Sequence, residues 1–146
     1  MRNFCIKLVV VALTVFVMVQ GCSTTRNSVK DHAALTQTTW QLIEMEGSDF
    51  ENMTKIWLKF ENGDEKKVSG YAACNRFFGA YEVTDHNLKF GNLASTKMFC
   101  PEMELESSFL KSLENIDRFE ISDSRLNLFY EKEKNLVFQP KINDDR

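Results

Sequence analysis

The sequence lacks the signatures of common catalytic sites, and it holds only two histidines. It has no Gly-x-Ser-x-Gly or His-Glu-x-x-His segment, no phosphate-binding loop and no Rossmann fingerprint. Catalysis by proton transfer needs a base, a nucleophile and a group that orients them, whereas His32 lies in a polar N-terminal stretch and His86 in a predicted turn. We therefore expect a protein that is not an enzyme, with no catalytic residues. Paired carboxylates among the 21 acidic residues stay open as an alternative.

Clusters of basic residues are also missing. Lys66 and Lys67 form the only adjacent basic pair, whereas a surface that binds nucleic acid needs several clustered cations to displace counterions from phosphates. The formal charge is −3, and it falls to −5 without residues 1–21, because that segment holds two basic and no acidic residues. This balance argues against nucleic acid as a partner and against attraction to an anionic membrane surface.

The sequence has no apolar run long enough for a membrane helix, which needs about 20 residues. Its longest run, Leu8–Val19, follows the basic residues Arg2 and Lys7 and ends just before Gly21 and Cys22. This order is typical of a bacterial lipoprotein signal, in which the cysteine becomes the lipidated first residue after cleavage. We therefore predict that the chain is attached to the membrane by lipid at Cys22. An ordinary cleaved signal with an incidental cysteine is the alternative.

This signal sets the expected domain organisation. Residues 1–21 would be removed, residues 22–35 would form a lipidated flexible tether because they are polar and lack apolar periodicity, residues 36–140 would form one domain, and residues 141–146 a charged tail. Two or more acyl chains would hold the protein stably in the membrane. Ser23, unlike an aspartate there, is compatible with export to an outer membrane. We expect the domain to face the periplasm.

Cysteine is scarce, with four residues in the whole chain. Cys5 lies in the predicted signal and Cys22 is the predicted lipid site, which leaves Cys74 and Cys100 in an oxidising compartment. We predict a disulfide between these two residues. Two buried reduced thiols are one alternative, and a metal site with His86 as a distant third ligand is another. The chain has no Cys-x-x-Cys segment, so we expect no metal and no cofactor.

Short segments with alternating apolar residues are abundant, and they predict a mainly β fold. In residues 55–61, for example, Ile56, Leu58 and Phe60 share one face, which indicates a strand with one buried side. The same pattern, interrupted by turn residues, predicts strands over residues 39–45, 55–61, 68–74, 77–83, 88–90, 118–122, 126–130 and 136–139.

One segment has helical periodicity instead. Its apolar residues recur at spacings of three and four, and they are Leu105, Phe109, Leu110, Leu113 and Ile116. Pro101 precedes them, and three early glutamates complement the positive end of a helix dipole, so we predict an amphipathic helix over residues 102–116. A cation site at these glutamates is the alternative to a solvated helix start. The apolar stripe of this helix is expected to cover a sheet.

Two segments resemble the META domain family, also called HslJ-like. Residues 68–81 read VSGYAACNRFFGAY and residues 93–100 read LASTKMFC. The family typically shows Gly-x-x-Gly-Cys-Asn-x-x-x-Gly-x-Tyr, then Thr-x-Met-x-Cys before a helix, and a tryptophan in the first strand. The matching residues here are Trp40, Cys74, Asn75, Gly79, Tyr81, Thr96, Met98 and Cys100. Ala73 stands where the second glycine often sits.

The resemblance covers about residues 36–139 and implies a small antiparallel barrel-like sheet with one helix packed against it. It also implies an envelope or secreted protein linked to heat shock, antibiotic tolerance or, in some relatives, motility or virulence, without a catalytic mechanism. Our leading hypothesis is a non-enzymatic envelope lipoprotein that supports stress tolerance through contacts with an envelope protein. A carrier of a small apolar ligand and an inhibitor of an envelope hydrolase, acting through residues 94–100, are the alternatives.

The residues of these segments also have structural interpretations. Gly70 and Gly79 suit bends or bulges in curved strands, and Asn75 tolerates a left-handed backbone. We expect the aromatic residues Phe77, Phe78 and Tyr81 to lie in the core rather than to line a ligand site, and we expect Met98 and Phe99 to be packed. Large side chains from nearly every element should fill the barrel, namely Ile56, Leu58, Phe60, Phe90, Phe109, Leu113, Leu128 and Phe138.

Overall fold

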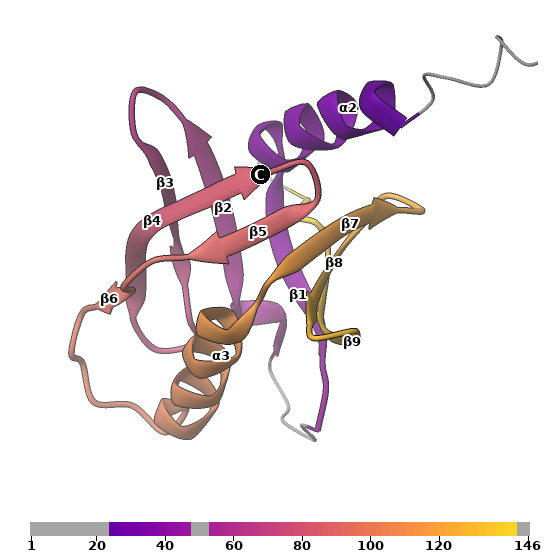
Figure 1. The fold of residues 1–146 in the computed structure, drawn as a ribbon. Coiled ribbons are helices and arrows are strands. Elements are labelled where there is room, and N and C mark those ends of the chain that lie inside the picture. Colours follow the sequence, from indigo (N-terminus) through magenta and orange to yellow (C-terminus); the bar gives the residue numbers. More distant parts are fainter. Residues whose placement is uncertain (1–23, 48–52, 143–146) are drawn as a thin grey trace, which may run out of the picture.

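The computed structural model of the protein describes residues 24–47 and 53–142 (Figure 1). The predicted signal, the lipid site Cys22 and residues 143–146 of the predicted tail lie outside the described residues. Within the described part of the chain, no helix combines the length and the apolar character that crossing a membrane requires.

Strands are the commonest secondary structure of the described chain, as the alternating pattern predicts. They are β1 (Thr39–Met45), β2 (Trp57–Asn62), β3 (Lys66–Tyr71), β4 (Arg76–Thr84), β5 (Asn87–Phe90), β6 (Ala94–Ser95), β7 (Arg118–Ser122), β8 (Arg125–Tyr130) and β9 (Glu133–Pro140). The helices are α2 (Thr24–Gln37), the short 3₁₀ helix η2 (Met53–Lys55) and α3 (Met103–Asn115). The two-residue strand β6 is too short to be found from alternation.

The strands form a closed antiparallel barrel. Neighbours follow the order β3-β2-β1-β9-β8-β7-β5-β4, and β3 also pairs with β4, which completes the circuit. Strand β6 pairs with β4 through Phe77 and Phe78, beyond the part of β4 that pairs with β5. The prediction of a mainly β, barrel-like fold with a helix packed against it is therefore confirmed.

The circuit is weakest between β5 and β7. A single register pair, Asn87 with Arg118, joins these strands, whereas six register pairs join β2 and β3. The two strands diverge from this point, and each contacts a helix: α3 contacts β5, and α2 contacts β7. Figure 1 shows α2 across one end of the barrel and α3 at the other. The helices thus support the two strands where strand pairing is sparse.

The barrel interior is filled by side chains from nearly every element. Seven of the eight residues predicted to fill it are buried, and the eighth, Phe90, is partly buried with its ring 6.0 Å from that of Phe60. The α3 residue Phe109 reaches the interior, with its ring centroid 5.8 Å from that of Phe77 and 6.4 Å from that of Phe138. The apolar stripe of α3 therefore closes the barrel core.

The prediction of a flexible tether over residues 22–35 is wrong for its described part, because residues 24–37 form α2. The helix docks through its C-terminal end: Leu35 is fully buried, and the indole Nε1 of Trp40 donates a hydrogen bond to the carbonyl of Leu35 at 3.1 Å. Leu35 is the one fully buried apolar residue among the described side chains of α2, so the segment shows no apolar helical periodicity that the sequence could reveal.

Candidate functional site

The family-like residues 72–75 form a tight turn after β3. The backbone N–H of Ala72 donates to the carbonyl of Asn75 at 2.8 Å, so the predicted strand over residues 68–74 ends at Tyr71 instead. The left-handed residue of this turn is Ala73, with φ of 76°, whereas Asn75, which would tolerate this conformation, does not adopt it. Glycine adopts positive φ at little cost, which explains why related sequences often place it at this position.

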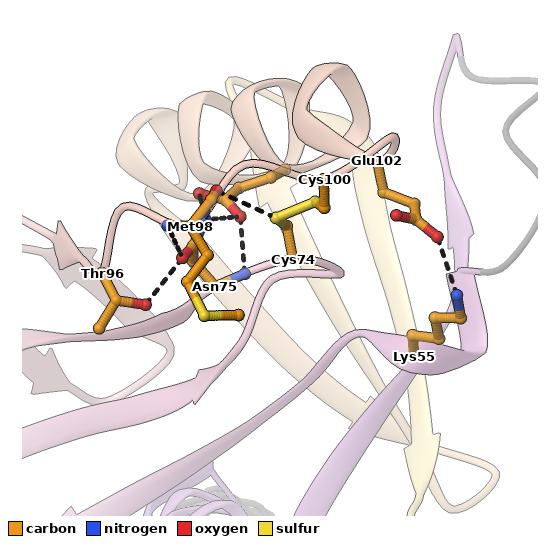
Figure 2. Close-up of a disulfide and its surroundings, with 8 residues drawn as sticks. Lys55, Cys74, Asn75, Thr96, Met98, Cys100 and Glu102 are labelled. Carbon is orange, nitrogen blue, oxygen red and sulfur yellow. Dashed lines mark hydrogen bonds and ion pairs between the residues drawn. A yellow bond between two sulfur atoms is a disulfide. The ribbon is translucent and has the colours of Figure 1, made fainter.

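The buried side chain of Asn75 connects this turn to residues 96–98. Its Oδ1 accepts hydrogen bonds from the hydroxyl of Thr96 at 2.8 Å and from the backbone N–H of Met98 at 2.7 Å. Its Nδ2 donates to the carbonyl of Met98 at 3.2 Å. One amide group thus holds both main-chain polar groups of residue 98, as Figure 2 shows.

Asn75 is also bound to helix α3 through Glu106. The carboxylate of Glu106 accepts from the backbone N–H of Asn75 at 2.8 Å and from its Nδ2 at 3.0 and 3.2 Å. Both residues are buried, and a buried carboxylate needs such donors to offset its lost hydration. The sequence analysis missed Glu106 as a site residue. A signal existed, because it precedes Phe109 and Leu113 at spacings of three and seven, on the inward side of the helix.

A disulfide lies beside this network and joins Cys74 to Cys100, which confirms the predicted pair. Cys74 directly precedes Asn75, and Cys100 directly precedes the turn into α3. The bond therefore fixes the far end of the segment whose start is held by Asn75. The alternatives of two reduced thiols and of a metal site at these cysteines do not describe this structure.

An ion pair holds the same segment at its last residue. Nζ of Lys55 lies 2.8 Å from Oε1 of Glu102. The hydrogen bond from Lys55 lowers the pKa of the Glu102 carboxyl, and the same bond raises the pKa of Lys55. Residues 96–102, which we call the clamped loop, are thus held at Thr96, Met98, Cys100 and Glu102 (Figure 2).

The side chains between these attachment points face solvent. Phe99 is 93% exposed and Met98 is 62% exposed, so the expectation that both residues are packed is wrong. Phe78 is 58% exposed on the outer side of β4, in contrast to the buried neighbours Phe77 and Tyr81, for which the core prediction is confirmed. The core expectation is therefore wrong for Phe78, and strand alternation explains why, because it places Phe78 on the face opposite to Phe77 and Tyr81. For Met98 and Phe99, apolar character alone does not report which side of the clamped loop faces the protein.

The remaining family-like residues hold the barrel together. A Cβ on Gly70 would lie 2.1 Å from the carbonyl oxygen of Trp57, and one on Gly79 would lie 2.7 Å from Cδ2 of Leu93, so both glycines permit close approach. The ring of Tyr81 packs edge-on against Phe60 at 5.0 Å, and burial raises the pKa of the Tyr81 phenol. These residues are structural, as is Trp40.

The two histidines meet at the junction of α2 with the turn between β4 and β5. Nε2 of His32 contacts the carbonyl of Asp85, and Nε2 of His86 lies 3.4 Å from the carboxylate of Asp31. Both rings pack against Phe119, at centroid distances of 5.9 and 5.8 Å. The pair therefore attaches α2 to the barrel. Among the described residues, no group of three or more His, Cys, Asp or Glu has the arrangement of a metal site.

One hollow of the described surface lies on the outer side of β3 and β4. It has a volume of about 560 Å³, and it is lined by Phe78, Gly79, Ala80 and Ser69 with charged side chains around them, among them Lys67.

Comparisons with known proteins agree with this geometry. The profile of the META domain family matches residues 33–143. An NMR structure of a protein from Burkholderia xenovorans is 24% identical to the chain, with a TM-score of 0.64 over 80% of this chain and 90% of that one. A crystal structure of a DUF4847 family protein from Bacteroides vulgatus is 14% identical, with a TM-score of 0.56 over 80% of this chain and 99% of that one. These likenesses show the fold. The comparison with curated proteins finds no match.

Proposed function

The chain belongs to the META domain family, and from this premise we propose that it is an envelope-anchored lipoprotein that supports stress tolerance through contacts with other proteins, without catalysis. The predicted lipoprotein signal with Cys22 supports the anchor, and Ser23 supports an outer-membrane position facing the periplasm. The resemblance stated from sequence supports a role in heat shock, envelope stress or antibiotic tolerance.

One observation carries the contact function. The polar groups of Asn75 and Thr96 form the hydrogen bonds that hold the clamped loop to the barrel. The side chains of Met98 and Phe99 in that loop face solvent. The buried carboxylate of Glu106 is likewise bound on both oxygens by Asn75. These bonds hold the turn, the clamped loop and α3 together, so we assign the cluster a structural role and assign binding to the exposed surface.

The test begins with the anchor. We expect Cys22→Ser to release the protein from membranes into a soluble or unprocessed form, since residues 1–21 are predicted to be removed and lipid is the only proposed attachment. Cell fractionation measures this result, and retention of the processed Cys22→Ser protein in membranes would contradict the lipoprotein proposal. In a strain that lacks the protein, the lipidated form should restore growth at elevated temperature or with antibiotic, and the released Cys22→Ser form should restore less.

A small-ligand carrier is the second candidate, and the hollow on β3 and β4 favours it. The barrel interior offers a ligand little room, because the rings of Phe60, Tyr81 and Phe90 contact one another there. A carrier would therefore use the outer hollow. Titration with oleate tests this candidate, with Ala80→Trp as the variant that fills the hollow. Saturable binding that Ala80→Trp abolishes would favour a carrier, and absence of binding would remove it.

A further inference from the structure

The clamped loop presents the most exposed large apolar side chain among the described residues. Phe99 is 93% exposed, and its neighbour Met98 is 62% exposed. Fully burying a phenylalanine is worth about 1.5–3 kcal/mol, so the fold forgoes a substantial gain at this position. Five other phenylalanines are fully buried or nearly so, namely Phe60, Phe77, Phe109, Phe119 and Phe138. Phe78 on β4 is 58% exposed, so Phe99 is the more exposed of these two phenylalanines and is nearly free of intramolecular cover.

The loop that carries Phe99 is fixed on both sides. Before it, the N–H of Thr96 donates to the carbonyl of Arg76 at 3.0 Å, and Asn75 binds both main-chain groups of Met98. After it, Cys100 is bonded to Cys74, and Glu102 is paired with Lys55. The backbone at Phe99 therefore has little freedom to lose on binding, and a preorganised loop binds more tightly than a mobile one of the same sequence.

The position of the loop in the fold decides between a membrane and a protein as its target. In Figure 1, the connection from β6 to α3 lies at the end of the barrel opposite to α2, and α2 follows the residues of the proposed lipid anchor. The loop therefore points away from the membrane that would hold the chain. Acidic residues also lie at its end, since Glu102 is its last residue and Glu104 is in the first turn of α3.

We propose that the clamped loop inserts the ring of Phe99, with Met98 beside it, into an apolar cleft of a folded envelope protein. This inference rests on the proposed contact function and names its surface and the chemistry of its partner. An envelope hydrolase whose cleft accepts the loop is one such partner. Aromatic residues buried at the centre of an interface supply a large share of the binding energy, and the rigid backbone fixes the direction in which the ring enters.

The first experiment places a photo-crosslinking phenylalanine analogue at position 99 of the full chain in living cells. Position 130 is the matched control, because Tyr130 is also an exposed aromatic residue but lies at the end of β8. Position 99 should give a distinct protein adduct that position 130 lacks, and mass spectrometry identifies the protein. The purified partner should then bind Phe99→Ala about tenfold or more weakly than the native chain, with Tyr130→Ala unchanged.

A second variant separates loop rigidity from the ring itself. Thr96→Val removes the hydroxyl that donates to Asn75 but keeps the shape of the side chain and leaves Phe99 in place. We expect it to keep a cooperative thermal transition and to weaken binding of the same partner about threefold, mainly through faster dissociation. Native-like affinity in Thr96→Val would overturn the role given to the clamp.

The remaining outcomes overturn the inference in distinguishable ways. A lipid adduct at position 99, or Phe99-dependent binding to vesicles of phosphatidylethanolamine and phosphatidylglycerol, would assign the loop to a membrane. Protein adducts at positions on other faces, such as Lys59 or Lys67, with none at position 99, would show that the clamped loop is not the binding surface. The proposed contact function would then stand. Absence of a protein adduct at every one of these positions would refute the contact function as well.

Discussion

At the scale of single residues, Asn75 joins three parts of the chain. Its backbone and side-chain N–H groups bind Glu106 of α3, and its side chain binds Thr96 and Met98 of the clamped loop. Asparagine suits this position because one amide offers both an acceptor for the N–H and a donor for the C=O of residue 98. An aspartate would lack the donor and would bring a second carboxylate against Glu106.

Ala73 is the residue at which we expect a single substitution to stabilise the fold. A non-glycine residue in the left-handed region costs about 1–2 kcal/mol of folding free energy. Replacing it by glycine recovers only part of this amount, because glycine is more flexible than alanine in the unfolded chain. We expect Ala73→Gly to raise the free energy of unfolding by about 0.5–1 kcal/mol. Urea denaturation measures it. The matched control is the neighbouring buried Ala72, whose φ is not positive; Ala72→Gly should destabilise, and a destabilised Ala73→Gly would contradict the argument.

At the scale of elements, the local pattern predicts strands well and long-range contacts poorly. Strands β1 and β7 have the bounds expected from alternation, since their buried and exposed positions follow one another with few interruptions. The bond from Asn75 to Glu106 spans 31 residues, and no local pattern encodes it. The exposure of Phe99 likewise depends on how residues 74, 75 and 100 meet in space. Sequence therefore gives the barrel and the pairing of cysteines, but not the clamped loop.

The buried side chain of Leu35 provides a test of how α2 docks on the barrel. Leu35 is fully buried, whereas Val29 on the same helix is exposed. We expect Leu35→Ala to lower the free energy of unfolding by about 3 kcal/mol, because it leaves a cavity where α2 meets the barrel, and Val29→Ala to change it by less than about 0.5 kcal/mol. Chemical denaturation gives both values. Equal effects of the two substitutions would show that the helix does not dock as described.

The ion pair between Lys55 of η2 and Glu102 at the start of α3 predicts that the stability of the fold depends on pH. Because Lys55 lowers the pKa of Glu102, the contribution of the pair to stability is present above the ordinary carboxyl pKa of about 4.5 and is lost as pH falls through the lowered value. Lys55→Met should raise the pKa of Glu102 towards its ordinary range in an NMR titration. Lys67→Met, which removes a lysine paired with Glu65, is the control and should leave Glu102 unchanged. An unmoved Glu102 in Lys55→Met would contradict the pairing.

At the scale of the whole molecule, the two ends of the described chain leave the barrel together. Trp40 of β1 is in register with Pro140 of β9, and the N–H of Lys141 donates to the carbonyl of Thr39 at 2.7 Å. The clamped loop lies at the other end (Figure 1). The clamped loop would thus lie at the end of the barrel away from the end where α2 enters.

The disulfide should support the stability of the whole domain. It closes a loop across a sequence separation of 26 residues, which corresponds to about 3.5 kcal/mol in the chain-entropy model. In the processed Cys22→Ser protein, thiol labelling should find neither Cys74 nor Cys100 reactive, and reductant should lower the melting temperature by roughly 10–20 °C. Two reactive thiols in the folded protein before reduction would show that the bridge does not form.

The sparse seam between β5 and β7 matters for crowding on a surface. Closed barrels expose few strand edges to neighbouring molecules, and a helix laid over a free edge blocks the templating of intermolecular sheets. Here α2 contacts β7 and α3 contacts β5 on the two sides of the seam. Many copies crowded in the plane of one membrane would therefore resist aggregation as long as α2 stays docked. A chain truncated before Thr38 lacks α2, and we expect the exposed edges of β5 and β7 to start fibril formation in it. An increase in thioflavin fluorescence over that of the full domain would measure this result.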